Sequence, residues 1–207
     1  LVLAGAGSGK TRTLIYRVAY LLANGIQPEN ILLLTFTNKA AREMLERVEK
    51  LLPMDTRRLW GGTFHSIGNR LLRKHSDRIG YRPSFSIMDR EDQKELLNSA
   101  IDGVGIDTKA RRFPKPDVLA NMFSLAVNTG EELEEIVLAR YPYFDRLLAE
   151  IEAVHVAYGE RKVATNSMDF DDLLVRTVGL LEEHGDVRDE LQHRFQFVLV
   201  DEYQDTN

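Results

Sequence analysis

The sequence has no cysteine, no long apolar run and no excess of positive charge. Without cysteine there are no disulfides and no thiolate metal sites, which fits a reducing cytosol. Membrane-spanning helices need about 20 apolar residues, and Leu1-Val2-Leu3 lacks the basic flank and cleavage site of a signal peptide. We therefore expect a cytoplasmic protein with no membrane partner. The net charge of -5 means that any nucleic-acid contact must be local.

The composition is otherwise that of a globular protein, with 43% hydrophobic and 29% charged residues in a chain of 207. This length suits one or two domains. The chain begins inside an apolar run without Met and ends at Asn207, directly after an acidic motif. We expect it to be a piece of a longer protein.

A glycine-rich string follows the first apolar run and reads Ala4-Gly5-Ala6-Gly7-Ser8-Gly9-Lys10-Thr11. Strand, glycine turn and helix start form the context of a phosphate-binding loop, in which backbone N–H groups and the lysine face the β- and γ-phosphates. Thr11 offers a hydroxyl to Mg²⁺. The usual pattern opens with Gly where this chain has Ala4, and a glycine turn that binds nothing is the alternative.

A second candidate motif, Asp201-Glu202-Tyr203-Gln204-Asp205, ends the apolar run 197–200. Such a run predicts a central parallel strand that is covered on both faces. Ligands of open α/β sheets bind beyond the carboxyl ends of the strands. Asp201 is therefore expected to face Thr11 and Mg²⁺, while Glu202 orients or deprotonates an attacking water. An acidic turn with no ligand is the alternative.

Strand and helix patterns alternate in the first part of the chain. Strands are predicted at 31–34 and 59–64, and helices at 11–23, at 39–52 and after residue 64. This alternation predicts an α/β fold with a parallel sheet.

Helical patterns then take over from Asp89 to Asn166. Asp89 is predicted to cap one helix, Thr129 with Glu132 to form a capping box for another, and a long helix is expected after Pro142. The basic segment 109–116 is expected to be an exposed connection. Helix and strand patterns resume after residue 166, so an all-helical insertion interrupts the sheet domain.

Three further strings make the set of motifs specific: residues 35–44 (TFTNKAAREM), 62–66 (GTFHS) and 168–174 (MDFDDLL). With the two motifs above, the whole chain resembles superfamily 1A DNA helicases of the UvrD/Rep/PcrA type. Family members use Ala or Gly at the Ala4 position. The resemblance implies a RecA-like P-loop parallel sheet with flanking helices, interrupted by a helical subdomain. Subdomain 1A would comprise residues 1–88 and a truncated second part, 167–207, and subdomain 1B residues 89–166.

The resemblance implies an ATP-driven motor that moves along single-stranded DNA, usually 3′ to 5′, and unwinds duplex at junctions with single strands. The cofactors would be ATP and Mg²⁺, and a second RecA-like domain of the parent chain would complete the site. Glu202, Lys10 and Gln204 would be catalytic, Thr11 and Asp201 would bind the metal, and residues from Ala4 to Arg12 would bind the nucleotide. The implied DNA contacts are Phe36, Thr37, Asn38, Thr63, Phe64 and His65.

Several of these residues also have structural interpretations. Arg12 would pack on adenine or be a solvated helix residue. Phe36 and Phe64 are core aromatics in the alternative interpretation, and His65 is favoured as a hydrogen-bonded structural histidine over a metal ligand. Trp60 is expected to pack in the core, while the basic side chains from Arg70 to Arg82 either flank DNA or form a solvated helix face.

Acidic clusters are interpreted as helix starts. Asp169, Asp171 and Asp172 are expected to cap a helix, with a second metal site as the alternative. The glutamates between Glu131 and Glu135 also suit a helix N-terminus.

Three other functions compete with the helicase interpretation. A helicase subunit of a helicase-nuclease complex has the same motifs, whereas a nucleotide kinase or unrelated P-loop NTPase explains the first and last motifs only. A DNA-binding module without turnover has no chemical need for Lys10, Asp201 and Glu202 together.

Overall fold

The computed structural model describes residues 8–52, 58–107 and 112–205. The chain divides into two compact units, a sheet unit (residues 1–71 and 179–207) and a helical unit (residues 72–178). The strand expected at residues 1–3 lies outside the described residues.

Among the described residues the sheet unit contains three parallel strands: β2 (Trp60–Thr63), β1 (Ile31–Thr35) and β5 (Phe197–Val200), in that order across the sheet. These positions confirm the predicted strands and the parallel α/β sheet. Thr35 lies opposite Thr63, and Leu34 lies opposite Val200. All three strands therefore end at the same edge of the sheet.

The prediction that β5 is covered on both faces is wrong for the part of the chain that the structure describes, because Val198 is 55% exposed. There β5 pairs with β1. Its central position stays a prediction, because the strand expected at residues 1–3 lies outside the described residues. The strand that is buried along its whole length is β1. An apolar run identifies a strand but does not show whether another element covers each of its faces, which explains the error.

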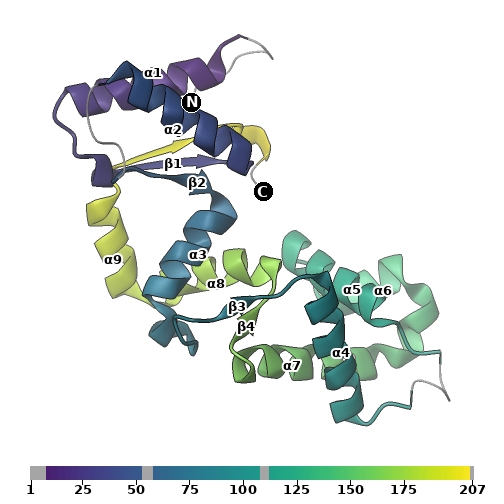
Figure 1. Ribbon diagram of the computed structural model, residues 1–207. Helices are drawn as coiled ribbons and strands as arrows, with labels where there is room; N and C mark the ends of the chain where they lie inside the picture. Colours follow the sequence, from purple (N-terminus) through teal and green to yellow (C-terminus); the bar gives the residue numbers. More distant parts are fainter. Residues whose placement is uncertain (1–7, 53–57, 108–111, 206–207) are drawn as a thin grey trace. The chain divides into compact units, whose positions relative to one another are not determined.

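Helices α1 (Lys10–Ala23) and α2 (Asn38–Leu51) lie together on one face of the sheet, as Figure 1 shows. Both were expected from their 3.6-residue apolar spacing. Burial of each aliphatic side chain stabilises this layer by about 1.5–3 kcal/mol. The buried core consists of Ile15, Val18, Leu21, Leu22, Ile31, Leu33, Met44, Val48 and Leu59.

Trp60 packs on the opposite face, beside Leu32, and is 3% exposed, which confirms its predicted packing role. The guanidinium of Arg70 lies 3.5 Å from the ring centroid, and that of Arg194 lies 4.6 Å from it. Arg70 comes from α3 (Phe64–Lys74), and Arg194 ends α9 (Gly185–Arg194). This tryptophan therefore ties two helices to β2.

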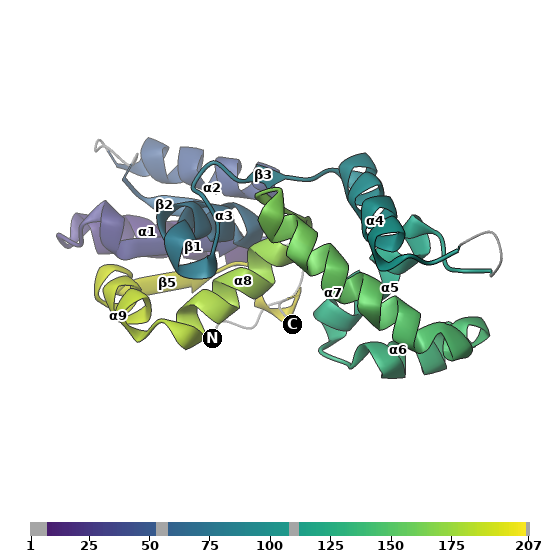
Figure 2. The same cartoon turned by 90° about the horizontal axis from the view of Figure 1, so that it is seen from below.

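The helical unit is built from four helices, α4 (Arg90–Val104), α5 (Pro116–Thr129), α6 (Leu133–Arg140) and α7 (Leu148–Ala164). It also holds the start of α8 (Phe170–Glu183) and a two-stranded parallel ladder of β3 (Ser86–Ile87) and β4 (Ser167–Met168). Helices α4 and α7 pack along each other (Figure 2). The fully buried side chains include Leu97, Leu119, Met122, Val137, Ile151 and Val154.

The described residues also contain short 3-10 helices, which lie at Pro28–Asn30, Ser76–Ile79, Pro142–Leu147 and Tyr203–Asp205. No helix in the described ranges is both long and apolar enough to span a bilayer.

The predicted caps of α4 and α6 have different outcomes. Asp89 caps α4 as predicted, but Thr129 does not cap α6. It ends α5, where its hydroxyl donates to the carbonyl of Leu125, and Gly130 with φ of 71° terminates that helix. The capping box of α6 is formed by Glu132 and Glu135, which confirms that these glutamates mark a helix start.

The other corrections concern the segments around proline. Residues Pro142–Leu147 form a 3-10 helix, and α7 begins only at Leu148. Within the basic connection, Phe113 and Pro114 are buried, so this part is not exposed. Phe113 is apolar enough to join the core of the helical unit, which outweighs the polar character of its neighbours.

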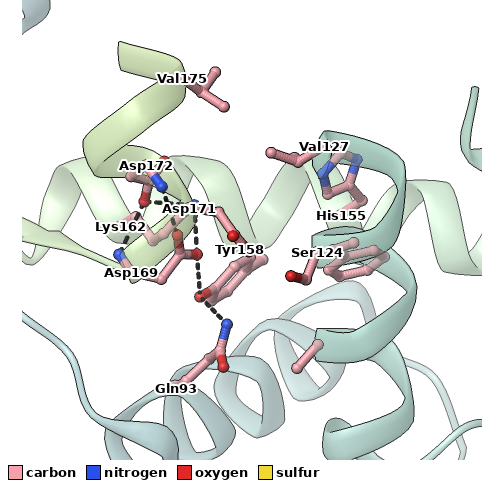
Figure 3. A pocket seen from close by; sticks show the side chains of 12 residues that line it. Gln93, Ser124, Val127, His155, Tyr158, Lys162, Asp169, Asp171, Asp172 and Val175 are labelled. Atoms are coloured by element: carbon pink, nitrogen blue, oxygen red, sulfur yellow. Dashed lines mark hydrogen bonds and ion pairs between the residues drawn. The ribbon is translucent and has the colours of Figure 1, made fainter. Parts of the chain in front are cut away.

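The predicted cap at the start of α8 is confirmed, and a lysine from α7 binds it, which the sequence did not indicate. The backbone N–H of Asp169 donates to Asp172 Oδ2, and that of Asp172 donates to Asp169 Oδ1. Lys162 from α7 lies 2.9 Å from Asp169 and 2.7 Å from Asp172 (Figure 3). Across the described ranges no group of three His, Cys, Asp or Glu residues could hold a metal ion. The aspartates therefore form a buried structural cluster.

Opposing effects determine the pKa of Asp169. Burial raises it, but Lys162, the backbone N–H of Asp172 and the hydroxyl of Tyr158 outweigh burial, so that the pKa is lower than that of an ordinary aspartate. The hydroxyl of Tyr158 donates to Asp169 Oδ2 at 2.9 Å.

Candidate nucleotide and nucleic-acid site

The predicted site residues follow the carboxyl ends of the strands. Asp201 follows β5, Phe36 follows β1, and Phe64 follows β2. Because the strands are parallel and in register, these three positions lie along one edge of the sheet unit. Helices α2 and α3 begin at the same edge, so their unpaired N–H groups point to it as well.

Two residues that are 190 positions apart meet at the start of α1. The hydroxyl of Thr11 donates to Asp201 Oδ2 at 3.2 Å. Lys10 Nζ lies 3.8 Å from Glu202 Oε2. The structure thus brings together the cation, the hydroxyl and the two carboxylates that the sequence assigned to one nucleotide site.

Gly9 has a φ of 93°, a left-handed conformation that only glycine adopts without strain. It is the N-cap of α1, and the helix begins at Lys10. Unpaired N–H groups at the start of a helix are a common binding site for anions such as phosphate. Ser8 is exposed. The predicted loop residues Ala4, Gly5, Ala6 and Gly7 lie outside the described residues.

Asp201 is held rigidly, whereas its neighbour lies in a strained turn. Asp201 is 6% exposed, and its backbone N–H donates to the carbonyl of Leu34 at 2.9 Å. Glu202 has a φ of 51°, which is unfavourable for a residue with a side chain and turns the chain sharply after β5. The side-chain amide of Gln204 donates to Glu202 Oε2. Glu202 thus has two partners, Lys10 and Gln204.

The donor set suits Mg²⁺ with bound phosphates. Mg²⁺ prefers hard oxygen ligands and keeps several waters or substrate phosphates in its octahedron, so one or two protein oxygens suffice. The hydroxyl of Thr11 and the carboxylate of Asp201 are such oxygens and are adjacent.

Arg12 lies on the surface of α1. It is exposed, and its guanidinium lies 5.4 Å from the ring centroid of Tyr16, one turn later on α1. The contact is an ordinary helix-surface pair. Both interpretations of Arg12, adenine packing and a solvated helix residue, are compatible with this position.

Two aromatic side chains lie at this edge of the sheet, where β1 and β2 end. The rings of Phe36 and Phe64 lie with centroids 5.5 Å apart and planes tilted by 58°. Phe36 is 41% exposed, and Phe64 is partly buried. A half-exposed pair of this kind offers a surface on which planar groups can stack.

Two of the predicted DNA-contact side chains also cap helices. Thr37 Oγ1 accepts a hydrogen bond from the N–H of Ala40 at the start of α2, and Thr63 Oγ1 accepts one from the N–H of Ser66 at the start of α3. Asn38 is exposed and His65 is partly buried. The sequence interpretation did not include these capping roles, although a Thr before a helix is a common capping signal.

Gly62 is a further residue that the sequence interpretation did not assign. A Cβ at this position would lie 2.3 Å from Ser66 Oγ. That hydroxyl donates to the carbonyl of Thr63 at 2.9 Å, so it would have to give up this bond. The glycine pair at 61–62 within a predicted strand was the available signal, because glycine in a strand often marks a close approach.

Comparison with known proteins agrees with this geometry. The family model described as "UvrD/REP helicase N-terminal domain" matches residues 1–207. The chain belongs to this family. Its relatives include the ATP-dependent DNA helicase PcrA of Bacillus subtilis, which is 42% identical over the whole chain, and that of Staphylococcus aureus (strain Mu50), which is 41% identical. PcrA of Staphylococcus epidermidis is 39% identical. This member of the UvrD/Rep family spans 27–28% of the length of these relatives.

Proposed function

We propose that residues 1–207 are the ATP-binding part of an ATP-dependent DNA helicase that couples MgATP hydrolysis to movement along single-stranded DNA. The contact between Thr11 and Asp201 is the observation that carries the proposal, because it brings the two nucleotide motifs into one site. Relatives that are named ATP-dependent DNA helicase support it. In this proposal the sheet unit belongs to a RecA-like subdomain 1A (1–88 and 167–207), and residues 89–166 form the inserted subdomain 1B.

Each nucleotide-site residue has a chemical role in this proposal. Lys10 and the N–H groups at the start of α1 neutralise the phosphates, together with the loop from Ala4 to Gly9. Thr11 and Asp201 hold Mg²⁺, which would supply charge neutralisation at the phosphate oxygens. Arg12 packs beside the adenine.

Glu202 orients or deprotonates the water that attacks the terminal phosphate. Its carboxylate lies 3.8 Å from Lys10 Nζ in a partly exposed ion pair. When Lys10 turns to the phosphates, the carboxylate becomes available to a water. In this proposal Gln204, which donates to Glu202, relays the state of the nucleotide to the DNA-contacting edge.

The proposed DNA contacts are Phe36, Thr37, Asn38, Thr63, Phe64 and His65. Bases stack on aromatic side chains for roughly 1–3 kcal/mol each, without regard to sequence, as a translocating motor requires. The helix starts at Thr37 and Phe64 present N–H groups to phosphates. Contacts of this kind need little net positive charge, so they are compatible with a chain of net charge -5.

The motor needs more than residues 1–207. A second RecA-like domain of the same parent chain would supply arginines to the nucleotide, and the loss of such an arginine typically costs 10³–10⁵ in rate. We therefore expect residues 1–207 alone to bind MgATP weakly and to hydrolyse it negligibly. Movement from 3′ to 5′ and unwinding at junctions of single-stranded and duplex DNA follow from the family resemblance.

Phosphate release by the full-length protein tests the proposal. Single-stranded DNA should stimulate the rate strongly, since the DNA edge and the nucleotide edge adjoin in one sheet. An oligonucleotide-free reaction and a reaction with the Lys10→Ala variant are the controls. A rate that does not respond to DNA would instead favour a P-loop NTPase that is not a helicase.

A further inference from the structure

A cavity of about 60 Å³ lies within the helical unit. Side chains from α4, α5, α7 and α8 line it, as Figure 3 shows. One wall is aromatic and the other carries Lys162 and three aspartates. None of the proposed nucleotide or DNA residues takes part.

The aromatic wall is formed by Phe123, His155 and Tyr158. The rings of Phe123 and His155 lie 4.5 Å apart, and those of Phe123 and Tyr158 lie 6.3 Å apart and nearly parallel. His155 is exposed, and one face of its ring packs against Phe123. Desolvation and the charge of Lys162 lower the pKa of His155 from its ordinary value of 6.5, which favours the neutral ring.

The acidic wall has one negative charge in excess. Asp169 and Asp172 are balanced by Lys162 and Arg176, whose Nε lies 3.0 Å from Asp172. Within the described ranges the hydrogen-bond partner of Asp171 is the neutral amide of Asn128, at 3.1 Å from Oδ1. Three carboxylates therefore face two cations, and the uncompensated charge is that of Asp171.

The size of the cavity limits the ligand. One water molecule needs roughly 10–15 Å³ of such a cavity, so about 60 Å³ holds about four to six water-sized groups. A guanidinium group, with its four heavy atoms, fits this size. Val127 and Val175, which are 39% and 47% exposed, form an apolar rim against which a methylene chain can pack.

We propose that this cavity binds the guanidinium of an arginine side chain that a peptide segment of a partner protein presents. The face of the His155 ring that does not pack against Phe123 attracts the cation. Asp171 accepts charge-assisted hydrogen bonds from the guanidinium, and Val127 and Val175 contact the stem of the arginine. Because Asp169 and Asp172 are saturated, specificity depends on Asp171 and the aromatic wall.

The probe is the capped tripeptide acetyl-Gly-Arg-Gly-amide, added to ¹⁵N-labelled protein of residues 1–207. We expect saturable shifts of the amides of Val127, Asn128 and Asp171, with a dissociation constant on the order of 1 mM. The same peptide with citrulline, a neutral isostere, should bind at least about five times more weakly, since it lacks the cation–π and charge-assisted contacts. This comparison needs no mutation.

Variants of the protein test whether the carboxylate of Asp171 binds the arginine peptide. Asp171→Asn should lower the affinity for the arginine peptide at least about fivefold, since it removes the uncompensated carboxylate. Asp102→Asn, an exposed aspartate on α4, is the matched control and should leave the affinity unchanged. Equal binding of the citrulline peptide, no shifts with the arginine peptide, or an unchanged affinity of Asp171→Asn would overturn the proposal.

Other occupants give distinct outcomes. If a ten-nucleotide oligothymidylate shifts the three amides more strongly than the arginine peptide, the cavity binds DNA and the proposal is wrong. Shifts that depend on protein concentration without any peptide would indicate a second copy of the chain and would also contradict a partner protein. Neither outcome bears on the proposed nucleotide site.

Discussion

Two clusters in this protein combine one lysine with two carboxylates, and they differ in how tightly these groups are paired. In the sheet unit Lys10 lies 3.8 Å from Glu202, with side chains that are 27% and 39% exposed. In the helical unit Lys162 lies 2.9 Å and 2.7 Å from Asp169 and Asp172, with side chains that are 9–11% exposed. One lysine and two carboxylates thus form a loose cluster in the sheet unit and a tight, buried one in the helical unit.

The local sequence explains the difference. Asp169 and Asp172 are three residues apart at a helix start, where each carboxylate accepts the backbone N–H of the other. Asp201 and Glu202 are consecutive after a strand, so their side chains diverge, one to Thr11 and one to Lys10. In the tight cluster the charged groups bind one another and stabilise the fold. In the loose cluster they keep hydrogen-bond donors and acceptors available for a ligand.

The largest expected effect of a single substitution lies in the loose cluster. Glu202→Gln in the full-length protein should lower the rate of ATP hydrolysis by about 10²–10⁴, since it removes the proposed general base. MgATP affinity should change little, because Lys10 and Thr11 remain. Phosphate release and a nucleotide titration measure the two effects. A loss of affinity as large as that of Lys10→Ala would assign Glu202 to binding instead.

A substitution in the tight cluster should lower the stability of the protein. Lys162→Met leaves the buried carboxylates of Asp169 and Asp172 without their shared cation, so we expect a loss of about 3–5 kcal/mol in the free energy of unfolding. Lys10→Met breaks an exposed pair and should cost at most about 1 kcal/mol. Urea unfolding of residues 1–207 compares the two variants. Equal losses would remove the distinction between the clusters.

The pH dependence of stability follows from the lowered pKa of Asp169. The ionised carboxylate stabilises the fold fully above the ordinary aspartate pKa of 3.8, and this contribution is lost as the pH falls through the lower pKa of the folded state. Asp169→Asn should therefore be about 2–3 kcal/mol less stable than the wild type at pH 6. The difference should shrink below pH 3.8. Urea unfolding between pH 2 and 6 tests this, and a difference that is independent of pH would contradict it.

The aromatic edge of the sheet unit should give the smallest effect. Phe36→Ala in the full-length protein should weaken single-stranded DNA binding by roughly 1–3 kcal/mol, as expected for the loss of one stacking ring. Tyr143→Ala is the control, because Tyr143 is 92% exposed and belongs to the helical unit. Fluorescence anisotropy of a labelled oligonucleotide measures both. Equal affinities of wild type and Phe36→Ala would show that single-stranded DNA does not bind at Phe36.

Periodicity and turn residues were sufficient to predict most of the fold. The apolar spacing of α1 and the run of β1 place both elements to within a residue or two, because burial dictates the residue type at each position. The neighbours of β5 and the cap of α6 were not predictable. The first depends on residues distant in sequence, and the second on Gly130 ending the preceding helix.

The residue types of the site and the pairing of Asp201 with Thr11 were predictable, but the pairing of Lys10 with Glu202 was not. Motif order indicated that Lys10, Thr11, Asp201 and Glu202 belong together, and the structure brings them together. The pairing of Lys10 with Glu202 and the link from Gln204 required coordinates, because they depend on a turn with positive φ at Glu202. Lys162, seven residues before Asp169, had no motif that could have indicated its partners.

Titration of residues 1–207 with MgATP tests most directly whether the two ends of the chain form one nucleotide site. We predict weak binding that requires Mg²⁺, and a loss of at least about tenfold in affinity, or 1.4 kcal/mol, for Lys10→Ala and for Asp201→Asn alike. Both variants should keep the far-ultraviolet circular dichroism of the wild type. Wild-type affinity in either folded variant would contradict a shared site.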